Sequence, residues 1–151
     1  MHYETAVEIQ APMERVWAVT TDVEGWPAWT ASVLSVDRLD GGPFLLGSRV
    51  AICQPKSPRA VWTVTALEPG RAFTWESRAT GVRTVATHRL KALPSGGTSV
   101  TLTVDATGLL AFLLGPLLRG TVRRLVEMEA EGLRRRCEGH GEASQAPHGA
   151  V

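Results

Sequence analysis

The chain has 151 residues, of which 44% are hydrophobic, and its 16 basic and 15 acidic residues leave a formal net charge of +1. One domain with a sizeable core is the default expectation for this length. The balanced charge gives no electrostatic reason to expect nucleic acid as a partner. The longest apolar run, residues 109–118, is shorter than the about 20 residues of a membrane span, so we expect no stable membrane insertion.

The two cysteines, Cys53 and Cys137, lie far apart in the sequence and in different predicted elements. Such a pair is more typical of reduced thiols in a cytosolic protein than of a disulfide framework. The start of the chain is half polar and lacks the apolar run of a signal peptide. Together these features predict a cytoplasmic protein.

The N-terminal segment predicts one strand followed by two short helices. Residues 3–9 alternate between a Tyr-Thr-Val-Ile side and a Glu-Ala-Glu side, which is the period of a half-buried strand. Pro12 suits the first turn of a helix over residues 13–21. Asp22 can cap a second helix over residues 23–29, which Pro27 must keep short or broken.

The rest of the chain predicts strands and then one helix. Six strands are expected, at residues 33–39, 47–54, 60–67, 71–78, 82–93 and 98–106. The short turns between them imply hairpins and an antiparallel meander. From residue 115 to 138, apolar side chains recur at spacings of three, four and seven, which predicts an amphipathic helix of about six turns. Residues 139–151 are small and polar and predict a disordered tail.

This order of elements predicts an α+β fold, in which a seven-stranded, curved antiparallel sheet wraps around a long C-terminal helix. The two short helices follow the first strand. One face of such a sheet must be covered, and only the final helix is long enough to cover much of it. Because the curved sheet encloses more space than one helix fills, we expect a ligand cavity between the sheet and this helix.

Several segments in order resemble the polyketide cyclase/dehydrase family of the START-like (SRPBCC) superfamily, which has the helix-grip fold. They are residues 11–17 (APMERVW), 21–29 (TDVEGWPAW), 47–49 (GSR), 67–75 (LEPGRAFTW) and 96–100 (GGTSV). The resemblance implies one ligand-binding domain over residues 1–138. It also implies a small hydrophobic or aromatic, polyketide-like ligand and neither a metal nor an organic cofactor. Its members have diverse activities, so the fold alone does not define the function.

The candidate ligand-binding residues are mostly aromatic or apolar side chains expected to face the cavity. They are Trp26, Trp29, Trp62, Phe73, Trp75, His88, Phe112, Leu117, Thr121 and Leu125. The first two tryptophans could stack on a ligand at the cavity mouth, or anchor the short helices on the sheet. The aromatic residues of the strands could form a cavity wall, although ordinary core packing explains them equally well.

His88 is the candidate catalytic residue, because a histidine inside a strand can act as a general acid or base near neutral pH. It shares a strand face with Ala86 and Leu90, and the alternative is a hydrogen-bonded core or rim histidine. No carboxylate stands at an obvious partner spacing, although Glu76 lies on the neighbouring strand. Three arginines could orient an anionic ligand group or lie on the outer sheet face, namely Arg49, Arg78 and Arg83.

Three functions remain open, for a protein that is a monomer or a homodimer. The first is a protein that binds a polyketide-like metabolite in secondary metabolism. The second is an aromatase/cyclase or dehydrase that folds a poly-β-ketone chain, largely by proximity. The third is a lipid or quinone carrier with residues 109–118 as an apolar flap. His88 near an arginine in the cavity would favour the enzyme, a purely apolar lining would favour binding, and buried Leu110, Phe112 and Leu113 would exclude the carrier.

Overall fold

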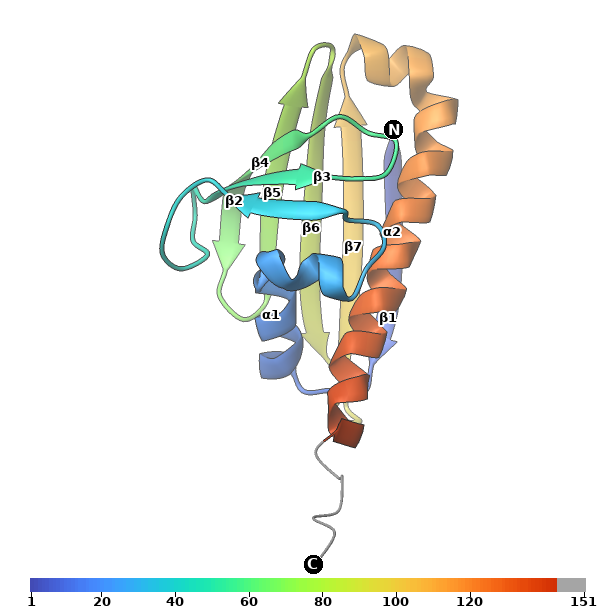
Figure 1. Ribbon diagram of the computed structural model, residues 1–151. Helices are drawn as coiled ribbons and strands as arrows, with labels where there is room; N and C mark the ends of the chain where they lie inside the picture. Colours follow the sequence, from blue (N-terminus) through green and yellow to red (C-terminus); the bar gives the residue numbers. More distant parts are fainter. Residues whose placement is uncertain (144–151) are drawn as a thin grey trace, which may run out of the picture.

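One curved antiparallel sheet and one long helix dominate the computed structural model, which describes residues 1–143 (Figure 1). The elements in chain order are β1 (His2–Ile9), α1 (Met13–Thr21), η1 (Val23–Ala28), β2 (Ser35–Arg38), β3 (Arg49–Cys53), β4 (Ala60–Glu68), β5 (Ala72–Ala79), β6 (Val82–Ala92), β7 (Thr98–Thr107) and α2 (Leu109–Ala143). The seven strands are ordered β1-β7-β6-β5-β4-β3-β2. The predicted α+β helix-grip architecture is therefore confirmed.

The meander forms because each strand from β3 to β7 lies beside the strand before it in the chain, and β1 then pairs with β7. The register places His88 of β6 opposite Phe73 of β5 and Leu102 of β7. Side chains alternate between the two faces of a strand. These directly opposed positions therefore share one face of the sheet, and it is the face that α2 covers.

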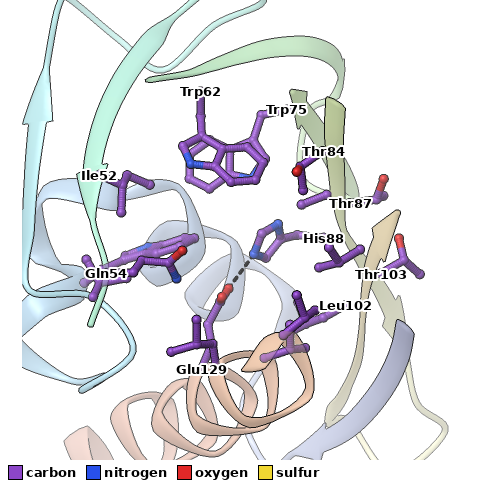
Figure 2. A pocket seen from close by; sticks show the side chains of 17 residues that line it. Ile52, Gln54, Trp62, Trp75, Thr84, Thr87, His88, Leu102, Thr103 and Glu129 are labelled. Carbon is purple, nitrogen blue, oxygen red and sulfur yellow. Dashed lines mark hydrogen bonds and ion pairs between the residues drawn. The ribbon is translucent and has the colours of Figure 1, made fainter. Parts of the chain in front are cut away.

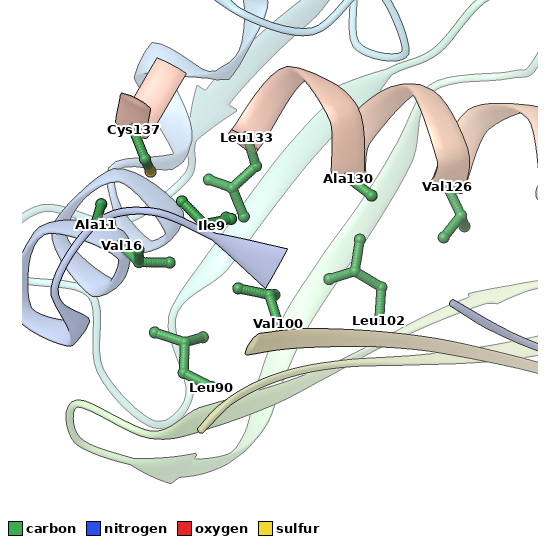
Figure 3. Close-up of a cluster of buried hydrophobic side chains, with 10 residues drawn as sticks. All are labelled: Ile9, Ala11, Val16, Leu90, Val100, Leu102, Val126, Ala130, Leu133 and Cys137. Atoms are coloured by element: carbon green, nitrogen blue, oxygen red, sulfur yellow. The ribbon is translucent and has the colours of Figure 1, made fainter. Parts of the chain in front are cut away.

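A buried cluster joins α2 to this face of the sheet (Figure 3). Its members are apolar side chains from both ends of the chain: Ile9, Ala11, Val16, Leu90, Val100, Leu102, Val126, Ala130, Leu133 and Cys137. The four that come from α2 recur at spacings of four, three and four, which places them on one stripe of the helix. The core therefore fixes which side of α2 faces the sheet.

The helix α2 begins six residues before the predicted start at Gly115, since it runs from Leu109. Pro116 lies inside it, and Figure 1 shows the helix changing direction near this end. Proline removes one backbone hydrogen bond and kinks a helix, but its fixed φ is compatible with helical geometry. The Gly-Pro pair therefore bends the helix and does not delay its start. At the other end α2 continues to Ala143, into the predicted tail, and residues 144–151 lie outside the described residues.

The predicted second helix is a 3-10 helix, Val23–Ala28, with Pro27 inside it. Its tighter turns suit a segment in which proline removes a donor from the backbone. The strand predicted over residues 33–39 is shorter than expected, because only Ser35–Arg38 pairs regularly with β3. No helix in the described part of the chain is long and apolar enough to cross a membrane.

Candidate functional site

A cavity of about 110 Å³ lies between α2 and the concave side of the sheet (Figure 2). Its lining comes from most elements of the fold: Trp26, Val33, Ile52, Gln54, Trp62, Trp75, Thr84, Ala86, Thr87, His88, Leu102, Thr103, Val104, Val122, Leu125, Val126 and Glu129. Two other hollows, of about 370 and 450 Å³, are larger and more open to solvent. The first is therefore the candidate site, since it alone of these three is built from buried aromatic side chains.

Three tryptophans form one wall of this cavity. The rings of Trp62 and Trp75 are tilted against each other with centroids 5.5 Å apart, and Trp26 meets Trp75 edge-on at 5.4 Å. The indole N–H of Trp26 donates to the backbone oxygen of Thr20 over 3.1 Å, so this ring is also held by a hydrogen bond. Such a rigid aromatic wall suits the faces and edges of another ring system.

His88 is fixed in the cavity lining by aromatic neighbours on several sides. Its side chain is only 5% exposed, and its ring stacks on Phe73 with centroids 4.5 Å apart and planes 10° apart. Trp26 and Trp75 contact the same imidazole at centroid distances of 5.5 and 5.9 Å. The imidazole therefore has one orientation, with its nitrogens held at defined positions in an apolar surrounding.

The partner of His88 is Glu129 of α2, whose Oε1 lies 2.5 Å from Nε2 (Figure 2). An ionised carboxylate can only accept hydrogen bonds, so Nε2 must be the nitrogen that carries the proton. In the neutral imidazole Nδ1 then has a free lone pair. That atom is buried and has no hydrogen-bond partner in the described structure. The pair can therefore accept a proton or a hydrogen bond at Nδ1, with Glu129 stabilising the charge that develops.

Glu129 is a residue of the candidate site that could not be found from local sequence spacing. It lies on α2 three residues after Val126 and four before Leu133, within the stripe that packs on the sheet. A carboxylate at that spacing was a usable signal, because acidic side chains are seldom buried unless they are paired. The histidine and the glutamate are 41 residues apart in the chain, so no local spacing connects them.

Glu76, the partner considered from the sequence, belongs to a different cluster. It accepts hydrogen bonds from Arg83 over 2.7 Å and from Arg78 over 2.6 Å, and these bonds lower the pKa of its carboxyl to about 2. Together with Arg49 and Arg78 it lines one of the open surface hollows. None of the three candidate arginines is among the residues that line the cavity, so the arrangement of histidine with arginine is not present there.

Five of the ten candidate ligand-binding residues line the cavity, and these are Trp26, Trp62, Trp75, His88 and Leu125. Two others support this lining from behind. Phe73 is buried beneath the imidazole of His88, and the half-buried Trp29 packs against Trp26 at a centroid distance of 5.6 Å.

Phe112, Leu117 and Thr121 do not line the cavity. The side chains of the first two are 82% and 75% exposed, and Thr121 is half-buried. The inward stripe of α2 contains Val122, Leu125 and Val126, and steps of four and seven residues extend it back to Leu118 and to the buried Ala111. The three misplaced residues lie on other sides of the helix. Leu110 and Leu113 are exposed as well, so the condition that would have excluded the carrier is not met.

The remaining polar groups of the lining are amide and hydroxyl groups, and Gln54 is among them. Its Nε2 donates to the backbone oxygen of Ser32 over 3.2 Å. The lining is therefore mostly apolar but not purely so, since it also holds the histidine–glutamate pair. No group of three or more His, Cys, Asp or Glu side chains in residues 1–139 could hold a metal ion.

Both cysteines are free, and their environments differ. Cys137 is buried in the core beneath α2, and this burial raises the pKa of its thiol to about 11. Cys53 is half-buried at the end of β3. Neither thiol lines the cavity, so cysteine chemistry has no place in the candidate site.

Comparison with known proteins places this architecture in a family. The family described as polyketide cyclase / dehydrase and lipid transport matches residues 1–138. No curated protein matches the chain.

Solved structures that share the fold include the ZhuI aromatase/cyclase from Streptomyces sp. R1128, at 21% identity and a TM-score of 0.75 over 100% of this chain and 99% of that chain. A START superfamily protein from Mycobacterium smegmatis has 16% identity and a TM-score of 0.73 over 92% and 98% of the two chains. Major latex-like protein 151 from Panax ginseng has 13% identity and a TM-score of 0.75 over 91% and 97%. With the family match spanning nearly the whole described chain, this protein belongs to the polyketide cyclase/dehydrase and lipid transport family and has its START-like, helix-grip fold.

Proposed function

We propose that this protein binds a small, mostly aromatic molecule that carries one hydroxyl group, and holds it in the cavity beneath α2. The observation that carries the proposal is a tryptophan wall that faces a buried imidazole nitrogen without a partner. A flat ring would lie against Trp62 and Trp75. A hydroxyl group directed at Nδ1 of His88 would satisfy that nitrogen, which otherwise leaves a buried acceptor unused.

The volume of the cavity sets the size of the ligand. An apolar cavity of about 150 Å³ can hold benzene, whereas drug-sized ligands occupy about 300–1,000 Å³. At about 110 Å³ the space inside this cavity suits a single ring, and a second fused ring can extend through the side that opens to solvent. The same volume disfavours a long folded poly-ketone chain unless α2 moves away from the sheet. We therefore infer a compact aromatic ligand of the kind that a polyketide pathway yields.

Isothermal titration calorimetry with 2-naphthol and with naphthalene tests the proposal. We expect wild-type protein to bind 2-naphthol about fivefold more tightly, since one net hydrogen bond contributes about 1 kcal/mol. His88→Leu should remove this preference. Trp62→Ala should lower the affinity for both ligands at least about tenfold, because an aromatic contact is lost. The matched control is Phe112→Ser, because that side chain lies outside the cavity. Absence of binding, or equal loss in the control, would contradict the proposal.

A cyclase or dehydrase activity is the second candidate, and the pairing of His88 with Glu129 favours it. Nδ1 could remove a proton from a carbon between two carbonyl groups. The resulting enolate would attack another carbonyl of the same chain, the new alkoxide would take up the proton, and loss of water would lead toward an aromatic ring. Such chemistry needs no cofactor.

The test of this second candidate is turnover of a short model poly-β-ketone, followed by the appearance of the aromatic product. We expect His88→Ala to lose at least about a hundredfold in rate, the contribution that general acid–base catalysis usually makes. Glu129→Gln should lose less, because it keeps an acceptor for Nε2 without the charge. If His88→Ala turns over the substrate as fast as wild type, the pair has no catalytic role.

A further inference from the structure

The first turns of α2 expose large hydrophobic side chains that the fold does not use. They are Leu109, Leu110, Phe112, Leu113, Leu114 and Leu117. Large contiguous apolar patches are uncommon on soluble monomers and mark interaction sites. The side chains belong to one short stretch of a single helix, so they form one patch, which we call the α2 apolar patch.

This patch is held in place at one end of the molecule. Figure 1 shows the start of α2 beside the turn between β5 and β6. The backbone N–H of Leu110 donates to the oxygen of Gly81 in that turn over 3.0 Å, and Ala111 is buried. The exposed side chains therefore project from an anchored turn of helix, and the surface they form is a fixed feature of the fold.

The charged side chains in the stretch that carries the α2 apolar patch have one sign. Residues 106–126 include no aspartate or glutamate, and they include Arg119, Arg123 and Arg124. All three arginines are exposed, and none forms an ion pair within residues 1–139. Arg119 follows Phe112, and Arg124 follows Leu117, by seven residues, which is about two turns or 10 Å along a helix.

We propose that the α2 apolar patch docks on the surface of an anionic lipid bilayer. Leucine and phenylalanine side chains would enter the boundary between headgroups and acyl chains, which an amphipathic helix penetrates by about 5–10 Å. The arginines, about 10 Å further along the helix, would then meet the lipid phosphates. This docking goes beyond ligand binding in the cavity, and neither property requires the other.

The charge pattern favours a bilayer over a second copy of the chain. In a symmetric dimer the same patch would face itself, so both copies would bring their arginines to the interface and no carboxylate from this stretch would compensate them. A soluble acidic partner would match the charges, but it would need its own apolar surface for six exposed hydrophobic side chains. Anionic lipid supplies both the negative charge and the apolar layer.

Vesicle flotation of the full chain tests the proposal, with phosphatidylcholine vesicles that contain either no or about one-third phosphatidylglycerol. We expect binding only to the anionic vesicles, and a loss of binding at high salt. The double variant Phe112→Ser with Leu117→Ser should bind anionic vesicles at least about tenfold more weakly. Changing any one of the three arginines to glutamine should weaken this binding about fivefold. The matched control is Leu45→Ser with Leu46→Ser, which removes two exposed leucines from the loop between β2 and β3.

Three outcomes would overturn the proposal. They are no flotation with anionic vesicles, equal flotation of the patch variant and wild type, and self-association of wild type that Phe112→Ser with Leu117→Ser abolishes. The last result would assign the patch to a second copy of the chain. The affinity for 2-naphthol is measured on the same samples. If the vesicles do not bind the protein but 2-naphthol does, membrane docking is refuted and the cavity function stands. If the vesicles bind the protein but 2-naphthol does not, the cavity function is refuted and membrane docking stands.

Discussion

Replacing Glu129 by leucine removes the only hydrogen-bond partner that a buried imidazole has within residues 1–139. His88 has a side chain that is 5% exposed, and its Nδ1 is already without a partner, so both ring nitrogens would be left unsatisfied. An unsatisfied buried donor costs about 1–3 kcal/mol. A leucine would also extend the apolar stripe of α2 and recover part of this loss. We expect Glu129→Leu to lower the free energy of unfolding by about 1–2 kcal/mol.

The reverse single change leaves a carboxylate without its partner. Glu129 has a side chain that is 14% exposed, so His88→Leu would strand a largely buried charge. Breaking a buried pair costs about 3–5 kcal/mol, and some remaining solvent contact reduces this to about 2–3 kcal/mol. Replacing both residues by leucine removes both polar groups, which is often close to neutral. The coupling free energy between the two positions should therefore be about 3–5 kcal/mol.

Urea unfolding of the four proteins at neutral pH, followed by tryptophan fluorescence, measures this coupling. Independent positions give additive changes within about 0.5 kcal/mol. Additivity at His88 and Glu129 would mean that the short contact contributes nothing, and it would refute the reasoning. The double variant also separates stability from function, because it should fold nearly as well as wild type and yet lose the preference for 2-naphthol over naphthalene.

Three further predictions follow from close packing and from the buried thiol. Gly132→Ala should lower the free energy of unfolding by about 1–3 kcal/mol, because a Cβ there would lie 2.4 Å from the backbone oxygen of Trp29. In Gly120→Ala, on the same helix, the new Cβ meets nothing within 4 Å, so this change should raise the free energy of unfolding by about 0.5–1 kcal/mol. Urea unfolding measures both variants, and two changes of the same sign would contradict this reasoning. A thiol reagent at neutral pH should modify Cys53 in the folded protein and Cys137 only after unfolding; rapid modification of both in the native protein would refute it. Burial raises the pKa of Cys137 from 9.0 to about 11, so between these values the folded state keeps a proton that the unfolded chain releases. The free energy of unfolding should therefore fall between about pH 9 and 11, by about 2–3 kcal/mol at most. Urea unfolding at a series of pH values measures this decline, and Cys137→Ala should remove it.

The sheet could be predicted from the sequence because its signals are local. Alternating side chains and glycine-containing turns mark β4, β6 and β7, and the predicted ends of these strands agree with the structure to within one residue. Their order then leaves few ways to pair them, because short turns force neighbours in the chain to be neighbours in the sheet. Strand alternation also predicts the aromatic face of the sheet. Trp62 and Trp75 were expected on a cavity wall, and both line the cavity.

The start of α2 could not be predicted by the same reasoning. Glycine followed by proline is a strong local signal against a helix, but Phe112 has a backbone N–H that bonds to the oxygen of Gly108, so the helix is already formed before Pro116. Phe112 and Leu117 were expected in the cavity and lie on the surface, because neither is on the stripe that runs from Val122 back through Leu118 to Ala111.

The contact between His88 and Glu129 could be predicted from the sequence only in part. Strand alternation places His88 on the inner face, and the helical stripe places Glu129 on the side of α2 that faces the sheet. Which residues of the two elements meet depends on the axial position of α2, which tertiary contacts such as the close approach of Gly132 to Trp29 determine and no sequence period reports. Even so, an unpaired carboxylate inside an apolar stripe requires a partner, and a single histidine on the opposing inner face was the residue able to supply one. The two anomalies, taken together, would have predicted the contact that neither element predicts alone.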